Sequence, residues 1–167
     1  MNILLSGICG IGKTAIASRL SKNLRVKHID LDKFSNLPCT RGWFDLNKCM
    51  PILQKEITGD FILDVGGSTI FHRGGNNDKH LSDILSLKGD SQIKVITLIA
   101  EKEITEKRFR ATRSLHTLAQ DDFEKIWLEW EEIIFPYWER CLDNLVDTSH
   151  LSIDQSCQII EKLLTLY

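Results

Sequence analysis

The sequence lacks the features that mark membrane, secreted and nucleic-acid-binding proteins. No apolar run approaches the roughly 20 residues that span a bilayer, and the first residues lack the basic and then apolar pattern of a secretory signal. The 21 Lys and Arg residues are outnumbered by 23 Asp and Glu residues, so no excess of positive charge indicates a nucleic-acid partner. We therefore expect a cytoplasmic protein that binds neither membranes nor nucleic acid.

Cysteine pairs with the spacing of zinc ligands are also missing. The five cysteines are odd in number and scattered, and we expect them to be reduced and mostly buried. With 167 residues, 43% of them hydrophobic and 26% charged, the chain is ordinary for a globular protein. We expect one domain over residues 1–167 that is a monomer or a weak homo-oligomer.

Residues 7–14 form one complete motif. They read Gly-Ile-Cys-Gly-Ile-Gly-Lys-Thr and match the phosphate-binding loop pattern G-x-x-x-x-G-K-[ST]. An apolar run, Ile3–Leu5, precedes the motif, and a helical pattern, Ala15–Leu20, follows it. Because the motif requires this order of strand, loop and helix, we favour a phosphate site over a glycine-rich turn that only joins the two elements.

The physical basis of such a site is the backbone of the loop. Glycines allow successive amides to point at phosphate oxygens, and the helix that follows adds the positive end of its dipole. Lys13 reaches the β- and γ-phosphates, and the Thr14 hydroxyl is a ligand for Mg²⁺. The predicted nucleotide-binding residues of the motif are Gly7, Cys9, Gly10, Ile11, Gly12, Lys13, Thr14 and Ala15.

Strand-like apolar runs alternate with helical patterns along the chain, as they do in βαβ units. Strands are expected at 3–5, 26–29, 61–65, 94–100 and 145–146, and helices from 13 onward and at 45–58, 80–87, 101–112, 120–144 and 153–166. Pro51 is expected to interrupt the helix over 45–58. The alternation predicts an α/β fold.

Acidic residues follow two of the expected strands, where an open α/β sheet binds its ligands. Asp30 and Asp32 come after the second strand, and an extended backbone would put both side chains on one face. Phosphoryl transfer uses such carboxylates to hold Mg²⁺ and to accept the proton of the acceptor hydroxyl, and solvated capping residues are the alternative. Asp64 ends the third strand, where an acid is costly unless it is paired or near a metal, so it is a predicted carboxylate for Mg²⁺.

Two further groups of residues have open interpretations. Gly66 and Gly67 suit either an ordinary turn or the close approach of a substrate to the backbone. Arg108, Arg110 and Arg113 suit either a solvated helix face paired with glutamates or the neutralisation of a transferring phosphoryl group. In the second case Arg113 is the best candidate for a lid arginine and Arg108 for a position over the adenine.

The histidines and the late aromatic residues are interpreted as structural. No histidine has a partner at metal-ligand spacing, and each is expected to be structural or exposed: His28, His72, His80, His116 and His150. The aromatic residues from Trp127 to Trp138 fit a packed helix face better than a base-stacking platform.

Together these motifs resemble those of the shikimate kinases and related small-molecule P-loop kinases. The resemblance rests on the phosphate loop, the Asp-x-Asp at 30–32, Gly66-Gly67, a late arginine, and the segments Tyr-Trp-Glu-Arg at 137–140 and Val-Asp-Thr-Ser at 146–149, in this order. It implies a three-layer fold with a five-stranded parallel sheet in the order 2-3-1-4-5, helices on both faces, and a short lid over ATP at about 113–120.

The resemblance also implies roles for particular residues. Lys13 would bind the phosphates, and Thr14, with Asp30 nearby, would hold the metal. Asp32 would lie at the acceptor hydroxyl, Gly66 and Gly67 at the acceptor, and Arg113 in the lid.

The acceptor half departs from the pattern of the family. Shikimate kinases hold their carboxylate substrate with arginines from the helix before the third strand and from just ahead of the late tyrosine, whereas the corresponding stretches, 42–45 and 132–135, contain none. A carboxylate without these partners loses charge-assisted hydrogen bonds of roughly 1.5–3 kcal/mol each. Shikimate itself is therefore not the favoured acceptor.

The sequence thus predicts an ATP-dependent kinase that phosphorylates a hydroxyl of a small metabolite and uses Mg²⁺. The predicted catalytic residues are Lys13, Asp32 and Arg113, and the predicted metal ligands are Thr14, Asp30 and Asp64. Two alternatives stay open: a nucleoside or nucleotide kinase of the same fold, and a non-enzymatic ATP-binding module that regulates a partner.

Overall fold

A computed structural model describes residues 1–36, 46–66, 76–87, 92–113 and 123–165. A parallel sheet of five strands has the order β2-β3-β1-β4-β5, as predicted. The strands are β1 (Asn2–Gly7), β2 (Lys27–Asp30), β3 (Phe61–Gly66), β4 (Ile93–Ile99) and β5 (Asn144–Asp147). The helices are α1 (Lys13–Leu24), η1 (Leu31–Asn36), α2 (Leu46–Glu56), α4 (Asn77–Leu85), α5 (Lys102–Arg113), α6 (Phe123–Glu129), η2 (Trp130–Ile134), α7 (Phe135–Glu139) and α8 (Ile153–Thr165).

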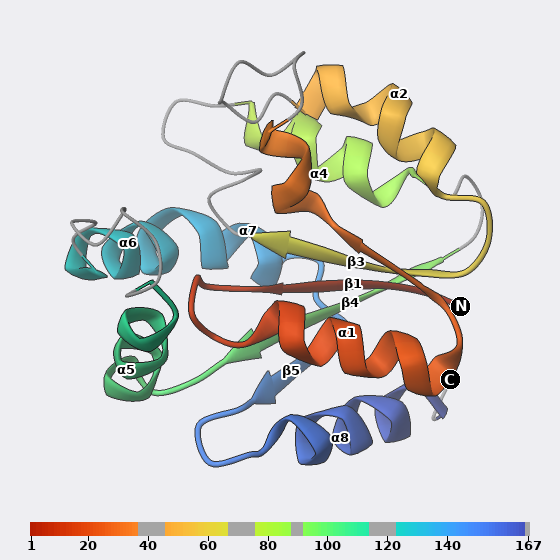
Figure 1. Cartoon of the computed structure of the whole chain (residues 1–167). Coiled ribbons are helices and arrows are strands. Elements are labelled where there is room, and N and C mark those ends of the chain that lie inside the picture. Colours follow the sequence, from red (N-terminus) through yellow and green to blue (C-terminus); the bar gives the residue numbers. More distant parts are fainter. Residues whose placement is uncertain (37–45, 67–75, 88–91, 114–122, 166–167) are drawn as a thin grey trace.

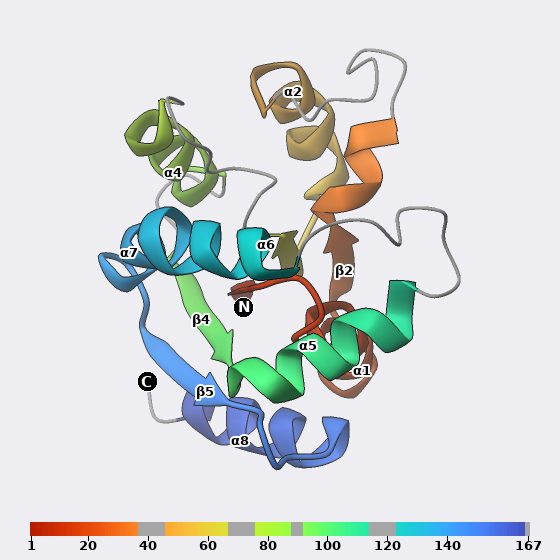
Figure 2. The same cartoon turned by 90° about the vertical axis from the view of Figure 1, so that its left-hand side faces the viewer.

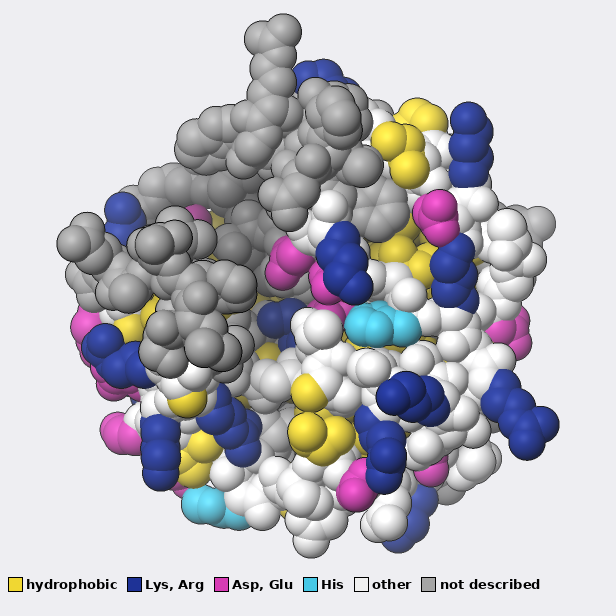
Figure 3. Space-filling model, viewed as in Figure 1, with side chains coloured by type: hydrophobic (Ala, Val, Ile, Leu, Met, Phe, Trp, Pro, Cys, Tyr) yellow, Lys and Arg dark blue, Asp and Glu magenta, His cyan; other side chains and the backbone are white. Residues whose placement is uncertain are grey.

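Helices cover both faces of the sheet, which gives the predicted three layers. Figure 1 shows α1 and α8 side by side in front of the strands, and Figure 2 shows α6 and α7 on the opposite side. Every residue of β1 and of β3 is buried, which explains why these central strands are apolar along almost their whole length. Lys, Arg, Asp and Glu side chains are intermixed on the face shown in Figure 3. No helix in the described ranges is long and apolar enough to cross a bilayer.

Helix α4 differs from the sequence-based prediction at its first residue, and helix α2 differs at Pro51. Helix α4 begins three residues earlier than expected, because the Asn76 side chain accepts a hydrogen bond from the Lys79 amide at 3.4 Å and caps it. Helix α2 runs through Pro51 without the predicted interruption. The proline is exposed, and the buried side chains of Cys49 and Leu53 hold the helix against the core on either side of it.

The helix predicted over 120–144 is also wrong in its interior and in its C-terminal boundary. Residues Trp130–Ile134 form a π-helical turn between α6 and α7, and the Phe135 amide donates to the Trp130 carbonyl five residues back. Pro136 follows at once, and since it has no amide hydrogen it cannot continue an α-helical ladder. Helix α7 ends at Glu139, and Asn144 already belongs to β5.

The end of β2 determines how the first two candidate acids lie. The strand stops at Asp30, and the chain turns directly into the 3₁₀ helix η1. The extended backbone that would have put Asp30 and Asp32 on one face is therefore absent. The Asp32 amide instead donates to Asp30 Oδ1 at 3.1 Å, a turn that short acidic side chains favour.

Candidate functional site

The loop after β1 depends on glycine at two positions. Gly10 has φ 86°, and a Cβ atom there would lie 2.8 Å from Phe109 Cβ on α5. Gly12 has φ 101° and is the residue before α1. Both conformations are strained for other residues. The loop therefore curls tightly enough for the first amides of α1, which have no partner within the helix, to face the space between β1 and α1.

Lys13 folds back over this loop. Its side chain is buried, and Nζ donates to the Ile8 carbonyl at 3.1 Å. The ammonium group is therefore held against the backbone of the loop. Cys9 is half-buried, and Ile11 belongs to the core.

Thr14 and Asp64 lie together beneath the start of α1. The Thr14 hydroxyl donates to Asp64 Oδ2 at 2.6 Å, and Asp64 is only 2% exposed. Asp64 is buried because it is part of the central strand β3, where it lies opposite Leu5 of β1 and Asp30 of β2. A hydroxyl and a carboxylate are hard oxygen donors of the kind that Mg²⁺ uses with substrate phosphates and water, so these residues fit that ion. No cluster of three His, Cys, Asp or Glu ligands occurs among the described residues.

Asp30 is the second carboxylate of the site and is partly buried, with 13% of its side chain exposed. Burial raises the pKa of Asp30, and the negative charges of Asp64 and Asp32 raise it further. Lys33 Nζ, 3.8 Å from Oδ2, and the Asp32 amide act in the opposite direction. Asp32 itself is exposed. The two acids thus differ in environment, with Asp30 beside Asp64 and Asp32 at the solvent edge.

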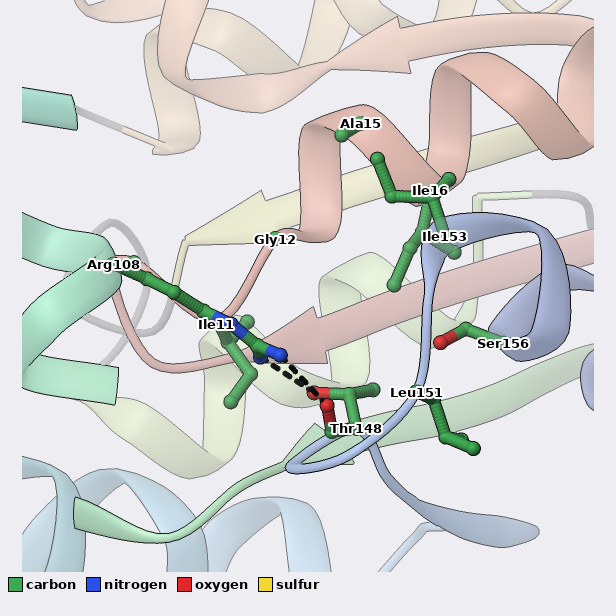
Figure 4. Close-up of a pocket in the computed structure, with 10 residues that line it drawn as sticks. Ile11, Gly12, Ala15, Ile16, Arg108, Thr148, Leu151, Ile153 and Ser156 are labelled. Carbon is green, nitrogen blue, oxygen red and sulfur yellow. Dashed lines mark hydrogen bonds between the residues drawn. The ribbon is translucent and has the colours of Figure 1, made fainter. Parts of the chain in front are cut away.

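A pocket of roughly 230 Å³ opens beside the loop. Figure 4 shows Arg108 reaching across it from α5 toward Thr148, which follows β5. One guanidinium nitrogen donates to Thr148 Oγ1 at 3.2 Å, and another donates to the Thr148 carbonyl at 2.8 Å and to the Ser149 carbonyl at 3.4 Å. Gly10, Ile11, Gly12 and Ala15 of the motif line the same pocket. The structure therefore brings Arg108 together with the phosphate loop.

Several residues of this pocket were not found from the sequence. Thr148 and Leu151 lie between β5 and α8, and Ile153 and Ser156 lie in the first turns of α8. Asp147 shapes this turn by accepting from the Ser149 amide at 2.8 Å and from its hydroxyl at 2.6 Å, and these hydrogen bonds lower the pKa of Asp147. The polar pair Thr148-Ser149 at the end of an apolar strand was the available signal, since strand ends bind ligands in such sheets.

The predicted lid and part of the predicted acceptor site lie outside this description. Gly66 ends β3, is buried and pairs with Gly7 of β1. Gly67 lies outside the described residues, as do residues 114–120 of the predicted lid. Arg113 ends α5, and its side chain is not described.

Comparisons with known proteins agree with this fold. No model of a known protein family matches the sequence. The chain is 29% identical over 165 residues to a nucleotide-binding protein of Thermosipho melanesiensis, and this match covers 98% of the chain but 53%, or about half, of that protein. It is 23% identical to a shikimate kinase of Dictyoglomus turgidum, with 94% of both proteins covered.

Solved structures of kinases also share the overall fold of this chain. The shikimate kinase of Bacteroides thetaiotaomicron matches with a TM-score of 0.71 and 18% identity, covering 99% of this chain and 98% of that one. A gluconokinase of Sinorhizobium meliloti matches with a TM-score of 0.65 and 12% identity, covering 99% and 92%. The chain has the fold of the shikimate kinases and related P-loop kinases.

Proposed function

We propose that the chain is an ATP-dependent kinase that transfers the γ-phosphoryl group of ATP to a hydroxyl of a small metabolite. The observation that carries this proposal is the contact between the Thr14 hydroxyl and the buried Asp64 carboxylate, directly beneath the phosphate loop. A buried acid at this position has a chemical use in a metal–nucleotide site and is otherwise costly. The similarity to shikimate kinases and to a gluconokinase supports the same class.

The donor nucleotide would occupy the loop and the pocket beside it. The loop amides and Lys13 would bind the phosphates, and Arg108, Thr148 and the apolar side chains near α8 would hold the base and ribose. Thr14 and Asp64, with Asp30 nearby, would hold Mg²⁺, which when bound neutralises charge on the phosphate oxygens.

Asp32 would act on the acceptor. Its exposed carboxylate stands at the carboxyl end of β2, next to Asp30 and at the edge of the site. In this position it would orient the acceptor hydroxyl and accept its proton as the phosphoryl group is transferred. Arg113 would neutralise charge on the transferring group from the lid.

An acceptor panel tests the proposal. Release of ADP from Mg-ATP would be measured with hydroxy acids, sugars, nucleosides and nucleotides, for the wild type and for Asp32→Asn. Asp60→Asn is the matched control, because Asp60 is exposed and precedes the opposite end of β3. We expect turnover with at least one hydroxy acid or sugar, and a fall of roughly 10²–10⁴-fold in Asp32→Asn with nucleotide binding retained.

The other outcomes separate the alternatives. Turnover only with nucleosides or nucleotides would assign the chain to that group of kinases. Nucleotide binding without turnover on any acceptor would favour a regulatory module.

A further inference from the structure

His28 has a buried ring nitrogen without a hydrogen-bond partner in the described part of the chain. The residue belongs to β2, and only 16% of its side chain is exposed. Residues two apart on a strand share a face, so His28 and Asp30 lie on the same face of β2. A buried polar nitrogen without a partner destabilises the fold, which is a reason to ask what the imidazole does.

The Asp64 carboxylate lies close to this nitrogen. His28 Nε2 lies 3.7 Å from Asp64 Oδ2, the same oxygen that accepts from Thr14 at 2.6 Å. A separation of 3.7 Å is too long for a hydrogen bond, so a hydrogen bond between the two groups requires them to move closer by several tenths of an ångström. Hydrogen bonds in catalytic sites are often long without ligand and shorten in the complex.

We infer that His28 is a positioning residue for Asp64, donating from Nε2 to Oδ2 and so fixing the orientation of the carboxylate beside Thr14. This inference rests on the proposed metal–nucleotide function of the site. Groups that hydrogen-bond to a metal ligand orient it, and losing one commonly weakens metal binding by roughly 10–100-fold. His28 would therefore strengthen the binding of Mg²⁺ with the nucleotide, and it would add little to the binding of the nucleotide alone.

The effect is specific to a side chain of the right length and polarity. Gln at position 28 places an amide nitrogen close to where Nε2 lies, and it can donate in the same direction. Asn is too short to reach Asp64, and Phe has a similar shape to His without a donor. These three substitutions separate hydrogen bonding from packing.

The experiment measures ADP affinity by calorimetry, with Mg²⁺ and with EDTA, for the wild type, His28→Phe, His28→Gln and His28→Asn. We expect Mg²⁺ to tighten ADP binding in the wild type, and His28→Phe and His28→Asn to lose roughly tenfold of this gain. His28→Gln should retain most of it, and affinities in EDTA should stay within about twofold because the loop is unchanged. His80→Phe, on α4, is the matched control and should behave as the wild type.

Three results would overturn the inference. The first is an unchanged Mg²⁺ effect in His28→Phe and His28→Asn. The second is an equal loss of affinity with and without Mg²⁺, because this indicates a general structural role. The third is a wild type whose ADP affinity does not respond to Mg²⁺, which would also remove the proposed function and is recognised before any variant is measured. If His28→Phe does not fold, the comparison of His28→Gln with His28→Asn decides the question alone.

Discussion

The proposed donor half and the proposed acceptor half of the site are built from different parts of the chain. The donor half consists of a continuous loop, the ends of central strands and the turn after β5, and it contains the short hydrogen bond from Thr14 to the buried Asp64 carboxylate. The acceptor half in the described residues consists mainly of Asp32, which is exposed, and Gly66. Under the proposed function, the residues for the donor are held by the sheet, whereas the choice of acceptor would depend on the segments between the elements.

Lys13→Met is expected to have the largest effect on the donor half. Removing a cation that binds transferring phosphates should lower turnover by roughly 10²–10³-fold. Lys22→Met removes an exposed lysine near the end of the same helix and should leave turnover unchanged. Turnover at saturating ATP measures both variants, and an equal loss in the two would contradict the role of Lys13.

Thr14→Val tests the contact at the base of the donor half. The substitution removes the hydrogen bond to Asp64 at 2.6 Å, leaving a buried carboxylate with one donor fewer. We expect roughly tenfold weaker Mg²⁺-dependent binding of ADP and a loss of about 1–3 kcal/mol in the free energy of unfolding. Thr58→Val, at an exposed position, is the control. Calorimetry and urea unfolding measure the two effects. Wild-type behaviour in both would contradict a role of the Thr14–Asp64 contact in metal binding and in stability.

Arg108→Met tests the wall of the nucleotide pocket. The guanidinium group donates to Thr148 and Ser149, and charge-assisted hydrogen bonds of this kind contribute roughly 1.5–3 kcal/mol. Because Arg108 also lines the pocket beside the phosphate loop, losing one charge-assisted contact with the nucleotide should lower the affinity for ATP about tenfold, while the KM for the acceptor stays the same. Arg110→Met breaks a solvent-exposed ion pair with Glu106 and should be neutral. A change confined to the KM for the acceptor would show that Arg108 does not contribute to nucleotide binding.

Asp30→Asn is expected to have the smallest effect, on stability. Because the pKa of Asp30 is raised in the fold, its ionised form destabilises the folded state, and this cost grows as the pH rises above the ordinary value of 3.8. Without Mg²⁺ and nucleotide, Asp30→Asn should be more stable than the wild type at pH 8, by at most about 1 kcal/mol because Lys33 and the Asp32 amide offset part of the cost. The difference should close as the pH falls to 3.8. Thermal unfolding at several pH values measures it, and a destabilised variant at pH 8 would show that the charge is well compensated.

The α/β fold could be predicted because the phosphate loop and the apolar strands are continuous in sequence, and the strand order followed from the resemblance to the shikimate kinases. Local chemistry that competes with these patterns was harder to foresee. Pro136 converts a helical turn to π geometry, Asn76 starts α4 early, and the 3₁₀ turn after Asp30 separates its environment from that of Asp32.

The residues of the candidate site divide in the same way, into those with a pattern along the sequence and those without one. Residues of the loop and the acids at strand ends were accessible from the sequence, since each has a local pattern. Thr148, Ile153 and Ser156 reach the pocket only through tertiary packing of β5 and α8. The position of His28 beside Asp64 arises from the pairing of β2 with β3, and no spacing along the chain indicates it.

The central claim is that the donor half serves the transfer of a phosphoryl group to a hydroxyl. The most direct test follows ³¹P resonances of Mg-ATP incubated with the protein and the panel of hydroxy acids and sugars. The account predicts that the γ-phosphate signal is replaced by that of a phosphate monoester, and that Asp32→Asn suppresses this change. Conversion of ATP only to ADP and inorganic phosphate, or an unchanged spectrum with every acceptor, would contradict it.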